Sequence, residues 1–176
     1  MKKEIEGATA VLVGKALWKW DRASNMATFE FGRKSQVIGT PGNVRELGEW
    51  ALDVQCAWRI TRQDQVVVGS RDVYYPAEYD ESKSIPSGFE WERDPNRRDK
   101  LLSVLFEANT KQFIVQKIEV GAAGDLRIAL DEGLSLDLFV DDSLSDERWR
   151  LFQRGKSGHF VVKGSGASPS HDPETH

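Results

Sequence analysis

The fold is decided by a hairpin pattern that is clearest in residues 126–140, LRIALDEGLSLDLFV. A three-residue loop at 131–133 pairs leucine and isoleucine with leucine on one face of the hairpin. The same register places Arg127 opposite Asp137 on the other face. Because a slip of one residue would reverse both faces, a register that satisfies both predicts an antiparallel hairpin. Gly133 fits the left-handed position that such a loop favours.

Two further segments, residues 17–31 and 147–162, show the same pattern around short turns. In each of them, large apolar side chains pair on one face, as expected of a half-buried hairpin. The predicted cross-strand neighbours are Trp18 with Phe31, Trp20 with Phe29, Lys19 with Glu30, Trp149 with Val162, Leu151 with Phe160, Phe152 with His159, and Glu119 (from a strand at 113–120) with Arg127.

Residues 49–60, EWALDVQCAWRI, alternate strictly between apolar and polar and predict one strand. A turn at RQDQ would place Ile60 opposite Val67. Continuing that register would bury Arg71 without a partner, which is costly for a charge. We therefore expect the second strand to end or bulge near Ser70, so that SRDVYYP leaves the sheet.

The sequence predicts a β-rich α+β domain with about nine strands in a curved antiparallel sheet or partial barrel. One main helix is expected at about 95–108, with Asp94 as its cap and Pro95 in its first turn, and it should pack against the sheet. A short helix is also expected within residues 5–15. Residues 1–164 should form a single globular domain, and the Gly/Ser/Pro-rich residues 165–176 a flexible tail.

Composition narrows the class of function. A net charge of −4 argues against a nucleic-acid partner because phosphate binding needs clustered basic residues. The single cysteine excludes an internal disulfide or a cysteine-based zinc site, and the core-facing Cys56 reads as a packing residue. We expect a cytoplasmic protein that is not bound to a membrane, since neither a signal peptide nor a long apolar run is recognisable. Catalytic, phosphate-binding, dinucleotide and calcium-binding motifs are also missing, so no catalytic residue, cofactor or metal is predicted.

Two clusters are candidate binding sites. Arg59, Arg71, Asp72 and Tyr74 could hold a carboxylate or phosphate, although an arginine–aspartate pair that anchors the chain at the sheet exit is the simpler interpretation. Residues 77–94 form a long loop, and long loops in small domains are often functional. Three aromatic residues stand there among carboxylates and could anchor a protein interface or fold back over a sheet edge; these are Tyr79, Phe89 and Trp91.

Several segments resemble a family of small uncharacterised bacterial proteins, over about residues 14–164. The segments are LWKWDRASNMATFEFGRK, GEWALDVQCAWRI, GSRDVYYP, ERWRLFQRG and HFVV. That resemblance implies no particular activity. The overall type is similar to toxin-immunity proteins, which implies binding by surface complementarity.

A non-enzymatic protein-binding module is therefore the leading hypothesis. The alternative is a small anionic ligand binder or an undetected enzyme that uses Arg59, Arg71, Asp72 and Tyr74. The alternative requires these four groups to converge in a pocket of roughly 300 Å³ or more, whereas the leading hypothesis expects them to pair on an open surface.

Overall fold

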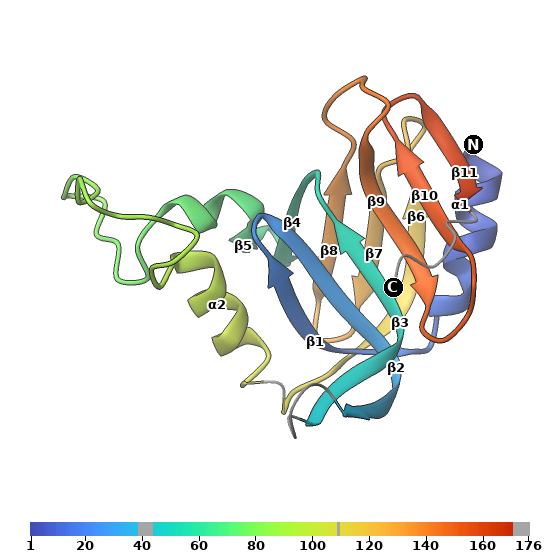
Figure 1. Ribbon diagram of the computed structural model, residues 1–176, viewed down its shortest axis with the longest axis horizontal. Coiled ribbons are helices and arrows are strands. Elements are labelled where there is room, and N and C mark those ends of the chain that lie inside the picture. Colours follow the sequence, from blue (N-terminus) through green and yellow to red (C-terminus); the bar gives the residue numbers. More distant parts are fainter. Residues whose placement is uncertain (39–43, 109, 171–176) are drawn as a thin grey trace.

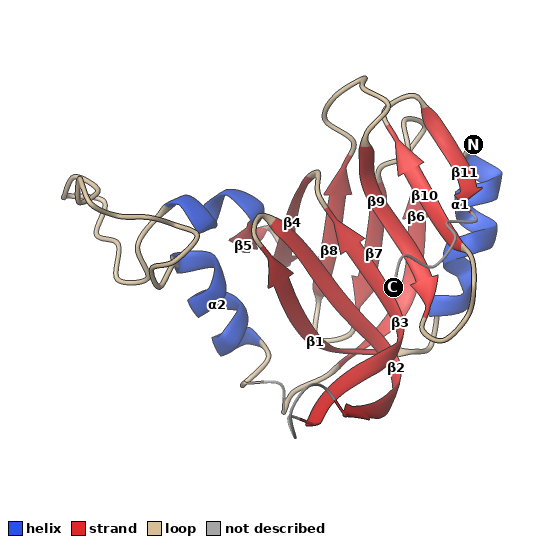
Figure 2. Ribbon diagram, viewed as in Figure 1, coloured by secondary structure: helices blue, strands red, loops and turns tan. Residues whose placement is uncertain are grey.

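The computed structural model describes residues 1–38, 44–108 and 110–170 of the chain. Within these ranges, eleven strands form one antiparallel sheet that does not close, in the order β11-β10-β9-β3-β2-β1-β6-β7-β8-β4-β5 (Figures 1 and 2). The strands are β1 (Ala16–Ala23), β2 (Met26–Ile38), β3 (Val44–Val54), β4 (Ala57–Arg62), β5 (Gln65–Gly69), β6 (Phe113–Val120), β7 (Leu126–Leu130), β8 (Leu134–Phe139), β9 (Glu147–Gln153), β10 (His159–Lys163) and β11 (Gly166–Ser170).

The helical elements are few, so the predicted β-rich α+β class is confirmed. They are α1 (Lys2–Thr9), the short 3-10 helices η1 (Ala10–Leu12) and η2 (Ser70–Tyr74), and α2 (Arg97–Leu105). Eleven strands replace the nine expected for two reasons. The alternating stretch at 49–60 breaks at Gln55–Cys56, where the chain leaves β3 and enters β4. The second additional strand is β11, which lies in the segment predicted as a tail.

The tail prediction is therefore wrong for residues 166–170. These residues pair antiparallel with β10 over five positions, from Lys163 opposite Gly166 to His159 opposite Ser170. Strand β10 offers a free edge, and backbone hydrogen bonds to that edge do not depend on side chains, so a Gly/Ser/Pro composition did not prevent pairing. Residues 171–176 lie outside the described residues.

The local hairpin registers are confirmed with two corrections. The pairs predicted for residues 126–140 and 147–162 are present, as is Glu119 opposite Arg127. In the first hairpin, a β-bulge between Leu17 and Lys19 places Leu17, not Trp18, opposite Phe31. In the hairpin of β4 and β5, a register irregularity between Ile60 and Thr61 places Ile60 opposite Val68, not Val67. Strand β5 does end at Gly69, and the chain leaves the sheet through η2, as expected.

The sheet bends so that its two halves enclose a single core. The ring of Phe29 on β2 packs edge-on against Trp58 on β4, with 5.3 Å between centroids. Trp149 on β9 is fully buried and its Nε1 donates a hydrogen bond to the Gly124 carbonyl beside β7. Since strands from both halves contribute to one continuous apolar cluster, the outer faces of the sheet are left for polar side chains.

Helix α2 begins two residues later than predicted. Asn96, not Asp94, is its N-cap: the Asn96 side chain accepts a hydrogen bond from the Asp99 amide at 3.0 Å. The Asp94 carboxylate instead accepts from the Glu90 amide, inside the preceding loop. The helix packs its buried Leu102 into the core. None of the described helices is both long enough and apolar enough to cross a membrane.

Candidate functional site

Residues 70–97, which we call the acidic lobe, extend away from the sheet at one end of the molecule (Figure 1). The lobe comprises η2, the loop 77–94 and the start of α2. Its loop begins and ends at one point, because Ala77 donates to the Pro95 carbonyl at 3.0 Å and Arg97 donates to the Tyr75 carbonyl at 2.8 Å. An isolated bridge between Pro76 and Asn96 completes this closure. The loop is therefore a self-contained unit of the kind that is frequently functional.

Four aromatic residues of the lobe contact one another in two pairs. Tyr74 and Trp91 form an edge-to-face pair with centroids 5.5 Å apart. Tyr75 and Tyr79 lie at 4.7 Å with a tilt of 43°. Phe89 and Trp91 are partly buried. These side chains do fold back, as one alternative expected, but Trp91 and Tyr79 fold onto tyrosines of the lobe itself, which gives the loop a fixed shape.

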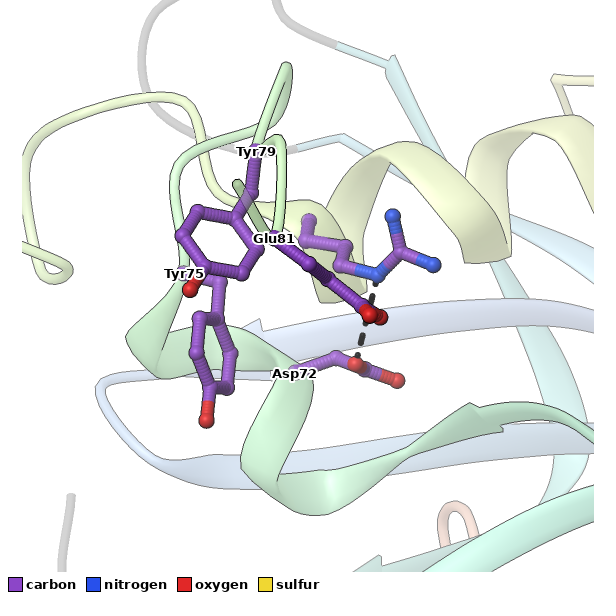
Figure 3. Close-up of a pocket in the computed structure, with 5 residues that line it drawn as sticks. Asp72, Tyr75, Tyr79 and Glu81 are labelled. Atoms are coloured by element: carbon purple, nitrogen blue, oxygen red, sulfur yellow. Dashed lines mark ion pairs between the residues drawn. The ribbon is translucent and has the colours of Figure 1, made fainter. Parts of the chain in front are cut away.

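A hollow of about 440 Å³ lies between the loop and α2, as Figure 3 shows. The rings of Tyr75 and Tyr79 lie on one side of it, and the carboxylates of Asp72 and Glu81 on the other. Asp72 accepts a hydrogen bond from the Gly69 amide at 2.8 Å and forms an ion pair with Arg97 at 3.5 Å. Asp72 thus anchors the chain at the sheet exit, but through Arg97 and not through an arginine of the predicted cluster.

A second hollow, of about 430 Å³, lies on the other side of η2. It is lined by Arg71 and Tyr74, with Cys56 and Asp141 among its other residues. Arg71 is exposed and makes no ion pair within the described residues. Arg71 and Tyr74 therefore share a hollow that Asp72 does not line.

Arg59 lies elsewhere, on the outer face of the sheet. Its Nε is 3.4 Å from the Asp137 carboxylate, which also accepts from the Nε of Arg127 at 2.6 Å. With Glu119 in register beside Arg127, four charged residues alternate in sign across β6, β7, β8 and β4. The hydrogen bonds that Arg127 donates to Asp137 raise the pKa of Arg127 above its ordinary value. The four residues of the predicted anion site are thus divided among three places.

Cys56 is a core residue and not a nucleophile. Its side chain is 5% exposed, and burial, with a smaller contribution from the nearby Asp141 carboxylate, raises the pKa of the thiol to about 12. Reactive thiols have a lowered pKa and partial access to solvent. Neither condition holds here.

We expect the Cys56 thiol to be inert in the folded protein. Near pH 8, a pKa of about 12 leaves roughly one thiol in ten thousand ionised. Labelling with a chromogenic disulfide reagent should be about 100-fold slower or more than in guanidinium chloride, where the chain is unfolded. Labelling of the native protein at the rate of the unfolded chain would show instead that the second hollow gives access to a reactive thiol.

The sequence did not predict two buried carboxylates that form ion pairs between distant parts of the chain. Glu30, 1% exposed, forms an ion pair with Arg154 and accepts a hydrogen bond from the Gly48 amide. Asp53, 4% exposed, accepts from Arg150 at 2.9 Å. Both pairs join segments that are far apart in the sequence, so no local pattern could have revealed them.

Arg98 was also missed, and it is the most deeply buried charge near the lobe. Its side chain is fully buried; its Nη1 donates to the Asn25 carbonyl at 3.2 Å, and its Nε lies 3.4 Å from Asp99. Its Nη2 has no hydrogen-bond partner among the described residues. Burial lowers the pKa of Arg98. Because Arg98 lies on a short helix with a weak apolar stripe, its burial could not be predicted from the sequence.

The net charge of the chain is concentrated in the loop of the lobe, residues 77–94. Residues 77–94 contain six carboxylates and two basic side chains, a net charge of −4. The whole chain also carries −4, so the remaining residues balance, with 22 basic and 22 acidic side chains. Residues 80–88 are all exposed, and Ile85 among them is 41% exposed. The lobe is therefore a projecting acidic surface on an otherwise balanced protein.

No protein-family model matches the chain, and no curated protein or solved structure is significantly similar to it. The resemblances named from the sequence therefore stay predictions. Within the described ranges, no three histidine, cysteine or acidic side chains are grouped so that they could hold a metal ion.

Proposed function

We propose that this protein is a non-enzymatic binding module whose acidic lobe binds a basic surface on a partner protein. The observation that carries the proposal is the concentration of the whole net charge in residues 77–94. Complementary charge accelerates encounter and selects among partners. A protein of the toxin-immunity type fits this proposal, because it needs only to cover a basic surface on its target.

The fixed shape of the loop supports the proposal. The tilted contact of Tyr79 with Tyr75 and the edge-to-face contact of Trp91 with Tyr74 hold the loop before any partner arrives. Turns inside the loop add to this order, for example where Lys83 donates to the Asp80 carbonyl at 2.9 Å. A surface that is already ordered loses less conformational entropy on binding, and it therefore binds more tightly for the same contacts.

The distribution of polar groups favours binding over catalysis. Asp72 and Arg59 are each held in an ion pair, with Arg97 and Asp137 respectively, and the sole thiol is buried with a pKa of about 12. Arg71 and Tyr74 do share a hollow, but they lack the other two members of the predicted anion site. An interface requires no convergence of reactive groups.

Neutralising two exposed carboxylates of the lobe should weaken binding. The variant Glu78→Gln/Glu90→Gln removes two charges that form surface ion pairs with Lys100 and Arg93, which contribute little to stability. Partners are captured with the full chain from a lysate of the organism that encodes it, and the Kd of each purified partner is measured by calorimetry. We expect the Kd to rise about 5- to 10-fold at low salt and the difference to shrink as ionic strength increases.

The matched control is Glu4→Gln/Glu6→Gln on α1. It changes the net charge by the same amount through two carboxylates that are also exposed and also in surface ion pairs. Its Kd should stay within about two-fold of the wild-type value. If both double variants weaken binding equally, or if no partner depends on the lobe charge, the proposed function is wrong.

A further inference from the structure

We propose that the hollow beside Tyr75 and Tyr79 binds the guanidinium group of an arginine on the partner protein. The partner itself comes from the proposed function, on which this step rests. The affinity of the hollow for a guanidinium group, however, can be measured without any partner.

The two rings provide the aromatic surface for such a group. Their centroids are 4.7 Å apart and their planes are tilted by 43°, so the rings form a bent wall along one side of the hollow. A cation within about 6 Å of a ring centroid is attracted by the electrons of the ring face. The planar guanidinium group of arginine also stacks on aromatic faces, which the compact ammonium group of lysine cannot do.

The opposite side of the hollow provides the charge. Of its charged residues, Asp72 is paired with Arg97 at 3.5 Å, whereas Glu81 forms no ion pair within the described residues. Two carboxylates, those of Asp72 and Glu81, thus face the one guanidinium group of Arg97. One negative charge in the hollow is left to be balanced. With a volume of about 440 Å³, the hollow has room for one long side chain beside this carboxylate.

The chain contains only three tyrosines, Tyr74, Tyr75 and Tyr79, which allows a direct test. Protein labelled with carbon-13 in the tyrosine rings is titrated with N-acetyl-arginine methylamide and followed by NMR. The control ligand is N-acetyl-citrulline methylamide, which has nearly the same shape and no charge. We expect the Tyr75 and Tyr79 signals to shift with a Kd on the order of 1–10 mM. Tyr74, which lines the other hollow, is the internal reference.

Two variants locate the effect. Glu81→Gln should weaken the binding of the arginine ligand about three-fold or more, and Tyr79→Leu, which keeps apolar bulk but removes a ring face, about five-fold or more. The control Glu6→Gln on α1 should leave the titration unchanged. Equal shifts with the citrulline ligand, or none with the arginine ligand, would overturn the proposal.

The two proposals fail separately. If a partner binds through the lobe charge but the tyrosine signals do not respond to the arginine ligand, the proposed binding module stands and the guanidinium pocket is excluded. If the tyrosine signals respond to the arginine ligand but no partner depends on the lobe, the guanidinium pocket stands and the proposed binding module is excluded.

Discussion

Replacing Asp137 with alanine is expected to lower the free energy of unfolding by about 3 kcal/mol. The Asp137 side chain is 2% exposed, and it accepts hydrogen bonds from Arg127 at 2.6 and 3.0 Å and from Arg59 at 3.4 Å. Without the carboxylate, the guanidinium groups of Arg127 on β7 and Arg59 on β4 would flank β8 with no anion between them. Both arginines are partly exposed, so water compensates in part, and the expected loss lies at the lower end of the range for a broken buried ion pair.

Urea unfolding followed by tryptophan fluorescence measures this effect, with the slope of the transition checked for change. The control Asp146→Ala removes a carboxylate that is 78% exposed and weakly paired with Arg148. It should change the free energy of unfolding by no more than about 0.5 kcal/mol. If Asp137→Ala lowers the free energy of unfolding by less than about 1 kcal/mol, the row of charged residues on the sheet contributes no more than ordinary surface ion pairs.

Replacing residues 78–94 with a short Gly/Ser linker should abolish partner binding while the domain still folds. The ends of the loop are joined by the Pro76–Asn96 bridge and by the hydrogen bond from Ala77 to Pro95, so a short linker can close the gap without moving η2 or α2. We expect the Kd to rise roughly 100-fold or more, because the loop carries the aromatic and acidic contacts of the proposed interface. Calorimetry with the purified partner measures the loss.

Thermal unfolding provides the control for folding. The shortened chain loses the contact between Tyr74 and Trp91 and the hydrogen bond from Ser24 to Glu92. A cooperative transition within about 8 °C of the wild-type Tm is expected. A full-length variant with all six loop carboxylates changed to amides then separates charge from shape. Unchanged partner affinity in the shortened chain would show that the interface lies elsewhere.

Elements built from neighbours in the sequence could be predicted, because their pairing leaves a local pattern. The register of Ile128 with Leu136 and of Leu151 with Phe160 follows from side chains across one short turn. The pairing of β3 with β9 leaves no such pattern, since it joins residues about 100 positions apart. The bulge at Trp18 could not be predicted either, because an inserted residue preserves the alternation of apolar and polar side chains on either side of it.

The candidate site shows the same division. Arg59, Arg71 and Asp72 are close in the sequence, but strand alternation turns Arg59 outward, and the 3-10 turn η2 directs Arg71 and Asp72 to different hollows. The loop was rightly identified as a long aromatic-acidic segment. Its stacking of Tyr79 on Tyr75 could not be predicted, since it depends on the tight turn in which Tyr79 donates to the Pro76 carbonyl.

The position of the lobe makes the charge distribution of the molecule asymmetric. Residues 77–94, with their charge of −4, lie at one end of the longest axis of the protein (Figure 1). A positive surface therefore exerts a torque on the protein as well as a pull, and turns it until the loop points forward. Because ions screen this field over about 8 Å at physiological salt, the rotation takes place only in the last moments of approach, and collisions in other orientations are not corrected from afar.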